Sequence, residues 1–266
     1  MKLTKKKGKK TKKSPLKDKP LREAGQSTQQ QIFNLANVDF LPIAIAAIFL
    51  SYFAILEWWR DFRNLPPAPI QVTIIALIFI GYSIYKYRKT KKELEALKLG
   101  RDGEKEVAAE LENLKEIGCS IFHDIVGSGF NLDHVIISEK GIFVVETKTR
   151  SKPVKGNPKI IYDGSVITAD GHILNPDPVA QVNAGAGWLK NVLKESTGKY
   201  FSVKSAVVFP GWFVENKVPP NSNTALVLNP KLLCAYIKKL PDTISREDKH
   251  LAAYHISRYI RVNYQP

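Results

Sequence analysis

Cysteine is scarce in this 266-residue chain, and the motifs of several common site types are missing from it. Its two cysteines, Cys119 and Cys234, cannot make a disulfide framework or a zinc finger. The five histidines show no zinc-ligand spacing, apart from one weak pair five residues apart. Residues 127–129 lack the Gly-Lys-Ser/Thr of a phosphate-binding loop, and residues 185–187 lack a Rossmann context. No serine or cysteine nucleophile has a convincing base nearby in sequence.

Acidic residues are nearly absent from two short segments, and these segments account for most of the net charge of +15. Residues 1–31 hold eleven Lys or Arg against Asp18 and Glu23, and residues 86–92 hold five basic residues and no acid. Residues 93–266 hold 22 basic and 20 acidic residues, a balance of only +2. The high isoelectric point is therefore no sign that the C-terminal part binds nucleic acid.

Charge is also absent from two apolar runs, at residues 40–56 and 64–85. The second run is long enough to cross a bilayer as a helix. The first is shorter, but Trp58 and Trp59 can extend it into the membrane interface. The alternative is a pair of buried helices in a soluble core, but neither run has the polar face of such a helix. A cleavable signal peptide fits less well, because a second run follows the first at once.

The two runs predict a membrane-anchored helical hairpin. Its basic outer flanks favour the cytoplasmic side, so both termini and the C-terminal domain are expected in the cytoplasm, at a plasma or inner membrane. Reduced cysteines agree with that compartment. The predicted segments are a basic disordered tail (1–37), transmembrane helix 1 (38–60), a short external loop (61–67), transmembrane helix 2 (68–86), a basic juxtamembrane linker (87–98), a domain (99–210) and its C-terminal helical extension (211–266).

The lysine-rich tail has two alternative roles. Tethering is the simpler one, because each basic residue near anionic lipid contributes about 1 kcal/mol of attraction. The other is the capture of nucleic acid near the membrane.

Hydrophobic periodicity predicts a mixed α/β domain after the hairpin, with Asp102 as a helix N-cap. The predicted helices cover residues 93–117, 177–195, 230–240 and 245–262, and the predicted strands cover residues 121–126, 132–138, 142–149, 202–209 and 225–228, with a small hairpin over 159–174.

Carboxylates and a lysine gather around one predicted β-hairpin. Glu146 and Lys148 are two residues apart and share a face of their strand. If Glu139 and Lys140 form a two-residue turn, residue i pairs with residue 279−i, and Asp133 lies opposite Glu146. If Gly141 joined the turn, a bulge would have to restore this pairing.

Two facing carboxylates repel each other unless a divalent cation or a shared proton neutralises them. Oxygen ligands of this kind suit Mg²⁺ or Mn²⁺, which can activate a water for attack on a phosphate. Lys148 could orient that water or offset the charge that develops on the phosphate oxygens. The alternative is a surface hairpin with a solvated Glu–Lys pair.

At these residues the sequence resembles the nuclease-related domain (NERD) family, which is placed in the restriction-endonuclease-like superfamily with a PD-(D/E)xK site. The resemblance covers about residues 99–210, and residues 211–266 match no known pattern. It implies a mixed sheet flanked by helices. Its motifs are Leu99–Glu104, Phe122–Ile125, Asp133–Val135, Gly141–Lys148, Asn175–Pro176 with Gln181, and Ala206–Phe209.

The resemblance implies roles for five residues. Asp133 and Glu146 would be metal ligands, Lys148 the catalytic lysine, and Glu104 an acid supplied by the first helix. Gln181 stands where related nucleases place a glutamine near the site. For Glu104 the alternative is a favourable charge in a first helical turn, and for Gln181 it is a polar helix position.

Basic residues follow the predicted site in a stretch without acids, which suits contacts to nucleic-acid phosphates. They are Arg150, Lys152, Lys155 and Lys159. The alternative is a solvated loop. Together these features predict a membrane-anchored Mg²⁺- or Mn²⁺-dependent nuclease that hydrolyses phosphodiester bonds in DNA. A catalytically silent module that binds nucleic acid or protein at the membrane is the alternative.

Overall fold

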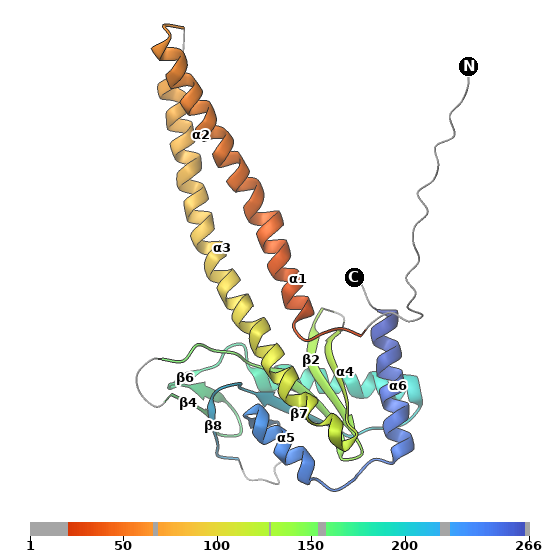
Figure 1. The fold of residues 1–266 in the computed structure, drawn as a ribbon. Coiled ribbons are helices and arrows are strands. Elements are labelled where there is room, and N and C mark those ends of the chain that lie inside the picture. The colour runs from red at the N-terminus through yellow and green to blue at the C-terminus, as the bar shows by residue number, and fades with distance from the viewer. Residues whose placement is uncertain (1–20, 66–68, 128, 154–157, 219–223, 264–266) are drawn as a thin grey trace, which may run out of the picture.

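The computed structural model describes residues 21–65, 69–127, 129–153, 158–218 and 224–263. It consists of a long helical hairpin that rises from one side of a mixed α/β domain (Figure 1). The first arm is continuous from Gln26 to Phe62 and comprises α1 (Gln26–Asn34), a π-helical stretch η1 (Leu35–Phe40) and α2 (Leu41–Phe62). The second arm is α3 (Pro69–Glu112).

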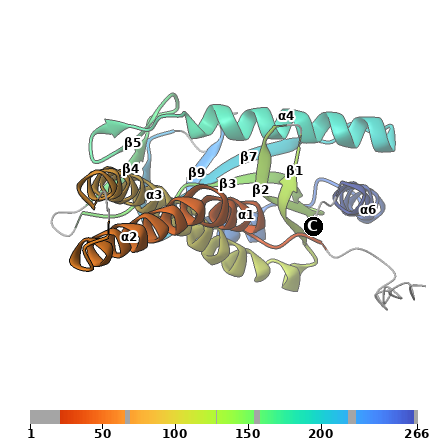
Figure 2. The same ribbon diagram turned by 90° about the horizontal axis from the view of Figure 1, so that it is seen from above.

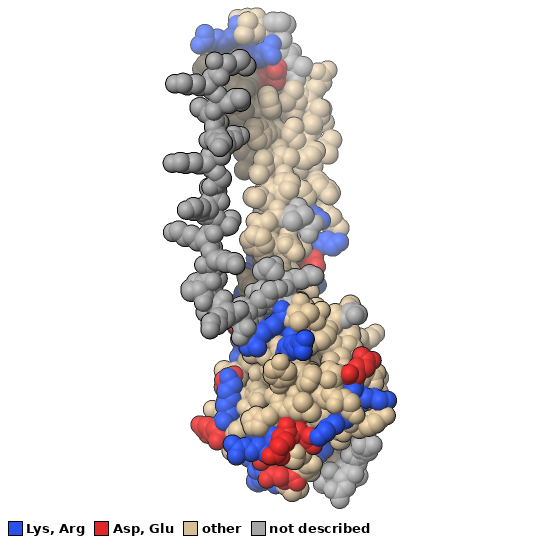
Figure 3. Space-filling model, turned by 90° about the vertical axis from the view of Figure 1, so that its right-hand side faces the viewer, with Lys and Arg blue, Asp and Glu red and all other residues tan. Residues whose placement is uncertain are grey.

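Both arms are long and apolar enough to cross a membrane. The most apolar stretch of the first arm has no buried residue, and almost none of the second is buried. Large apolar side chains therefore face outward along the rod, whereas a core helix of a soluble protein would bury them. Figure 3 shows the rod as mostly uncharged, with basic side chains gathered at its far end.

The hairpin differs from the sequence prediction at both of its inner ends. The predicted disordered tail included residues 21–34, but Arg22 and Ile32 are buried and α1 is helical. The predicted linker at 87–98 is part of the uninterrupted α3, so Asp102 lies inside a helix and does not cap one. Good helix formers without proline fill residues 86–112, which explains the continuity.

The main sheet has five strands in the order β1-β2-β3-β7-β9. Its first three strands are an antiparallel meander, and β7 and β9 add in parallel. The strands are β1 (Ser120–Val126), β2 (Asn131–Ser138), β3 (Gly141–Thr147), β7 (Val203–Val208) and β9 (Leu226–Leu228).

Helices cover both faces of this sheet (Figure 2). One face packs against α4 (Pro178–Thr197) and α6 (Arg246–Val262). The other packs against the end of α3 and against α5 (Pro230–Lys239). The 3₁₀ turn η2 (Lys115–Ile117) that follows α3 is exposed. This layering confirms the predicted mixed α/β fold.

A second sheet has four strands in the order β6-β5-β4-β8. Its strands are β4 (Lys159–Tyr162), β5 (Ile167–Ala169), β6 (His172–Ile173) and β8 (Phe213–Asn216). The sequence did not predict β8, which lies far from β4 along the chain and pairs with it in parallel. Residues 211–266 are thus not only helical, because β8 and β9 complete the two sheets.

The β2–β3 hairpin has the register predicted from a two-residue turn. Ser138 pairs with Gly141, and His134 pairs with Val145, so residue i pairs with residue 279−i. Gly141 is the first residue of β3, and its φ of 135° is a conformation that suits glycine. No bulge is needed, and the register places Asp133 across from Glu146.

Candidate active site

The candidate active site lies at the end of β2 and β3 that faces the base of the hairpin. The Thr147 backbone N–H donates a 2.7 Å hydrogen bond to Asp133 Oδ2, which fixes that carboxylate beside β3. Glu146 is 5% exposed although it carries a carboxylate. A buried acid at the end of an apolar strand needs a partner, so this position is chemically unusual for a plain hairpin.

Lys148 joins two of the predicted residues. Its Nζ donates to Glu146 Oε1 at 2.7 Å and to Gln181 Oε1 at 2.8 Å. Gln181 reaches the site because it stands in the first turn of α4, which begins after the N-cap Asp177. The ammonium group therefore spans the gap between β3 and α4, and an exposed amide orients it.

Glu104 comes to the same site from α3, on the other side of the sheet. The helix approaches closely because residue 103 is glycine. A Cβ there would lie 2.0 Å from Thr149 Oγ1, which is far too close. Glycine is therefore required for the contact that brings Glu104 to the end of β3.

Burial and mutual repulsion raise the pKa values of the site carboxylates. Burial, together with the charges of Asp124 and Glu146, raises the pKa of Glu104 to about 7. Burial and the charges of Glu146 and Glu104 raise the pKa of Asp133 well above its ordinary value. Burial also raises the pKa of Glu146, which the Lys148 ammonium opposes. A cation at this point would relieve the repulsion of all three acids.

Asp124 is a further acid at this site, and the sequence interpretation did not assign it a role. Its neighbours in β1, His123 and Ile125, pair with His134 and Leu132 of β2. Asp124 therefore lies across from Asp133, although these two residues do not form a strand pair themselves. Asp124 has a left-handed backbone with φ of 49°, a conformation that aspartate tolerates better than most residues. The sequence signal for a role of Asp124 was an acid within the mostly apolar run of β1.

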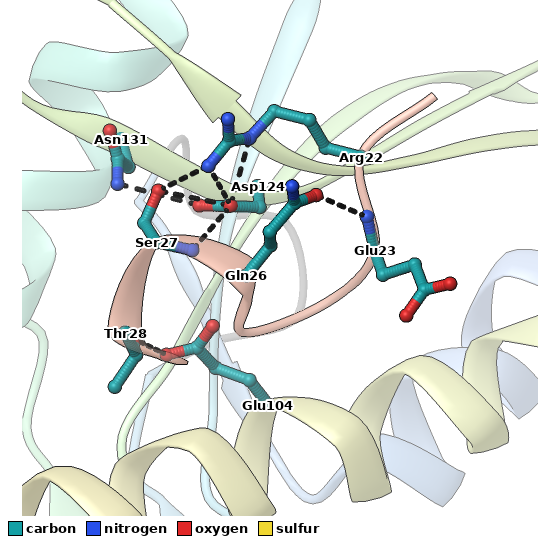
Figure 4. Close-up of polar contacts among 8 residues, drawn as sticks. All are labelled: Arg22, Glu23, Gln26, Ser27, Thr28, Glu104, Asp124 and Asn131. Carbon is teal, nitrogen blue, oxygen red and sulfur yellow. Dashed lines mark hydrogen bonds and ion pairs between the residues drawn. The ribbon is translucent and has the colours of Figure 1, made fainter. Parts of the chain in front are cut away.

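Arg22 and Ser27 bind Asp124 from the N-terminal segment (Figure 4). The Arg22 guanidinium donates to Asp124 Oδ2 from Nε at 3.0 Å and from Nη2 at 2.8 Å. The Ser27 amide and hydroxyl donate to the same oxygen at 2.8 and 3.0 Å. Thr28 Oγ1 donates to Glu104 Oε1 at 3.2 Å. No sequence signal singled out these three residues within the basic tail.

Two histidines link Glu112 of α3 to Thr147, the residue next to Glu146. His123 Nδ1 lies 2.8 Å from His134 Nδ1, and His134 Nε2 lies 3.1 Å from Thr147 Oγ1. Burial lowers the pKa of His134 to about 3, so its ring is neutral. We assign the protons from the contact of His123 Nε2 with Glu112, which places the His123 proton on Nε2 and leaves its Nδ1 as an acceptor. His134 Nδ1 then donates to His123, and His134 Nε2 accepts from the Thr147 hydroxyl. His134 is thus a structural residue on the face away from Asp133.

The predicted basic loop is partly described. Arg150 and Lys152 are exposed, and Lys152 Nζ lies 5.4 Å from the centre of the Trp212 ring. Lys159 is also exposed but forms an ion pair with Glu215 on β8. Lys155 lies outside the described residues. Arg150 and Lys152 are therefore the basic side chains of this loop that are better placed to meet a phosphate.

The donor set of the site fits a hard divalent cation. Mg²⁺ keeps several waters and is held by one or two carboxylates together with substrate phosphates. Asp133 and Glu146 supply such a pair, and the pKa of Asp133 is raised first by burial and then by the charges of Glu146 and Glu104. Among the described residues, no group of three His, Cys, Asp or Glu side chains is spaced to hold an ion by itself.

Comparison with known proteins identifies the same part of the chain. Residues 99–210 match the family model of the nuclease-related domain, NERD. Over 95 residues the chain is 33% identical to an uncharacterized protein of Bacillus anthracis. The matched region covers 34% of this chain and 44% of that protein. The chain thus spans less than half the length of this curated relative. No solved structure matches the chain. Residues 99–210 are therefore a nuclease-related, nuclease-like module.

Proposed function

We propose that the protein is a membrane-anchored, metal-dependent nuclease that hydrolyses phosphodiester bonds in DNA on the cytoplasmic side. The observation that carries this proposal is the convergence of Asp133, Glu146 and Lys148 at the same end of β2 and β3 in a nuclease-related domain. This trio agrees with the PD-(D/E)xK pattern that the sequence resembles. Glu104 and Gln181 complete the proposed site from α3 and α4.

Each side chain of the site has a chemical task in this reaction. A Mg²⁺ or Mn²⁺ ion held by Asp133 and Glu146 would polarise the phosphate and acidify a bound water. Lys148 carries a positive charge beside those acids, where it can stabilise the charge that develops on the phosphoryl oxygens. Gln181 accepts from Lys148 and limits its rotation. Glu104 adds a carboxylate that can accept a proton near neutral pH.

Membrane anchoring is supported by the exposure of the apolar arms. Ile48 and Phe49 are 69% and 60% exposed, and Ile78 on the second arm is 67% exposed. Such a rod would aggregate in water unless lipid or protein covered it. Basic residues flank both inner ends, which favours cytoplasmic termini. The anchor would hold the nuclease-like module close to the membrane surface.

The test is a cleavage assay on the full chain in detergent or lipid nanodiscs. Substrates are linear DNA, circular DNA and RNA, with Mg²⁺, Mn²⁺ or EDTA. Lys148→Ala and Asp133→Asn should each abolish metal-dependent cutting, because one removes the stabilising charge and the other a metal ligand. The full chain is needed because Arg22, Ser27 and Thr28 contact the site acids.

The outcomes separate the proposed enzyme from its alternatives. Cutting that persists in both variants would come from a contaminant and would contradict the proposal. A folded wild-type protein that binds Mn²⁺ without cutting would favour a silent binding module. Its near-neutral domain charge predicts weak affinity for nucleic acid without help from the tail. A protein that neither cuts nor binds Mn²⁺ would be a membrane scaffold.

A further inference from the structure

Both arms of the hairpin deliver side chains to the site acids at their inner ends. Glu104 lies on α3, which continues the second arm, and Thr28 lies on α1, which begins the first (Figure 4). The Thr28 hydroxyl donates to Glu104 Oε1 at 3.2 Å. The Gly25 backbone also forms a hydrogen bond with Glu104. The acid is therefore held by the segment that precedes the first apolar run.

The docking of this segment is a buried contact and not a chance surface encounter. The side chains of Arg22 and Asp124 are 5% and 4% exposed. Ala24 and Ile32 are also buried, with exposed fractions of 7% and 8%. A buried charge pair with this many hydrogen bonds has one stable geometry, because each alternative leaves a charge without a partner. Because Ser27 also binds Asp124, this contact fixes the position of Thr28, the next residue in the chain.

Glu104 needs such a partner because of the charges around it. Its half-buried carboxylate lies near Asp124 and Glu146, and both repel it. A glutamate side chain has three rotatable bonds, so repulsion would turn an unrestrained Glu104 away from the other acids. The Thr28 hydroxyl is a neutral donor that holds the carboxylate in place without neutralising it. Arg22 meanwhile compensates the charge of Asp124.

We propose that Arg22, Ser27 and Thr28 belong to the active site, with Thr28 as a positioning residue that orients Glu104 and the Arg22–Asp124 pair as the contact that holds Thr28 there. The inference rests on the proposed nuclease function. The membrane hairpin then has a second task besides anchoring, since its two arms jointly set the geometry of one site acid. A module that begins at residue 93 would lack this element.

The test compares variants of the full chain in nanodiscs by DNA cleavage and by Mn²⁺ binding. Thr28→Val removes the hydroxyl and keeps the shape, and Thr28→Ser restores the hydroxyl. Outer-shell partners of a site typically matter by about 10- to 100-fold. We expect Thr28→Val to lower kcat about tenfold with little change in KM, and Thr28→Ser to stay within about twofold of wild type.

A matched control distinguishes positioning from docking. Gln29 accepts a 2.7 Å hydrogen bond from Arg101, the neighbouring contact between α1 and α3, and it touches no site acid. Gln29→Ala should therefore leave kcat unchanged. Because Thr28 acts through Glu104, the double variant Thr28→Val/Glu104→Gln should be no slower than Glu104→Gln alone.

Several results would overturn the inference. One is a Thr28→Val variant that cuts like wild type, and another is a loss equal to that of Gln29→Ala. Additive effects of Thr28→Val and Glu104→Gln would also contradict it. If the wild-type protein does not cut but binds Mn²⁺, a roughly tenfold weaker Mn²⁺ affinity in Thr28→Val alone would still support positioning. A wild type that neither cuts nor binds Mn²⁺ refutes the nuclease proposal and this inference together.

Discussion

Arg22 and Asp124 form a buried ion pair although they are 102 positions apart in the chain. The contact joins the segment before the hairpin to the first strand of the nuclease-related domain. Asp124, the acid of β1, has a left-handed backbone with φ of 49°, and its carboxylate contacts Arg22.

Breaking this pair should release the N-terminal segment. In Arg22→Met, Asp124 loses its counterion, which typically costs about 3 kcal/mol or more for a buried pair. The loss is limited because the segment can undock and let water reach Asp124. We expect α1 to lose hydrogen-exchange protection. Lys199→Met, which breaks the exposed pair with Asp248, is the control and should cost less than about 1 kcal/mol. Unchanged protection of α1 would contradict the buried contact.

The site acids should make the metal-free protein less stable as pH rises. Glu104 has a pKa of about 7 in the folded state against 4.5 ordinarily, so the native protein holds a proton that the unfolded chain loses between these values. Stability is therefore highest below pH 4.5 as far as this group is concerned, and it falls as pH rises through 7. The change is on the order of 3 kcal/mol for a shift of this size.

Thermal unfolding between pH 5 and 8 in EDTA measures this effect. Glu104→Gln should flatten the profile, whereas Glu106→Gln, an exposed acid on the same helix, should leave it unchanged. Mn²⁺ should raise the melting temperature more at pH 8 than at pH 5, because the metal competes with protons for the acids. A profile that Glu104→Gln does not alter would refute the assigned pKa.

Gly103 should be intolerant of a side chain. In Gly103→Ala the new Cβ would collide with Thr149, so α3 must move and Glu104 with it. We expect a destabilisation of about 1–3 kcal/mol and a loss of cleavage. Thr149→Ala removes Oγ1 and Cγ2, which would lie 2.0 and 2.9 Å from the new Cβ, and leaves only the Thr149 Cβ at 3.0 Å. The double variant should therefore recover most of the stability and the cleavage. Thr149 Oγ1 is a buried atom without a hydrogen-bond partner among the described residues, so its removal should cost little.

Gly100→Ala is the matched control for this prediction. It lies on the same helix, and a Cβ there meets nothing within 4 Å. The substitution should stabilise the helix by about 0.5–1 kcal/mol, because alanine is the better helix former. Equal losses in the two alanine variants would point to helix propensity and not to the contact with Thr149.

Arg150 and Lys152 should contribute more to DNA binding than Lys159. Each phosphate contact that is lost lowers the slope of log K against log salt by about 1. Alanine at Arg150 or Lys152 should produce this change. Lys159→Ala should produce a smaller one, because its ammonium already pairs with Glu215. Fluorescence anisotropy with a DNA duplex in metal-free buffer at several salt concentrations measures the slopes. Wild-type slopes in all three variants would exclude this loop from the interface.

Single introduced cysteines can test the membrane topology. Phe62, 80% exposed, lies at the tip of the hairpin, and Tyr254, 61% exposed, lies on α6. An impermeant maleimide should label Phe62→Cys in intact cells and label Tyr254→Cys only after permeabilisation. The native thiols add little background because Cys119 and Cys234 are buried. Labelling of Tyr254→Cys in intact cells would reverse the proposed orientation.

The local part of the site could be predicted from the sequence for a clear physical reason. Strand alternation and a two-residue turn fix which residues face each other, so Asp133 and Glu146 could be paired by arithmetic. The basic loop was visible as a run of charge. Lys159 was grouped with it because its partner Glu215 lies on β8, a short strand with little periodic signal.

The sequence alone determined the mixed α/β class, the two apolar helices, the β2–β3 register and the grouping of acids with Lys148. These are properties of short segments, set by periodicity, turn length and local composition. Only the tertiary structure decided that α3 continues unbroken to Glu104, that β8 joins the second sheet, and that Arg22, Ser27 and Thr28 reach the site. Such contacts join segments far apart in the chain, and their stability comes from burying and satisfying charges that are paired only once the whole domain is assembled.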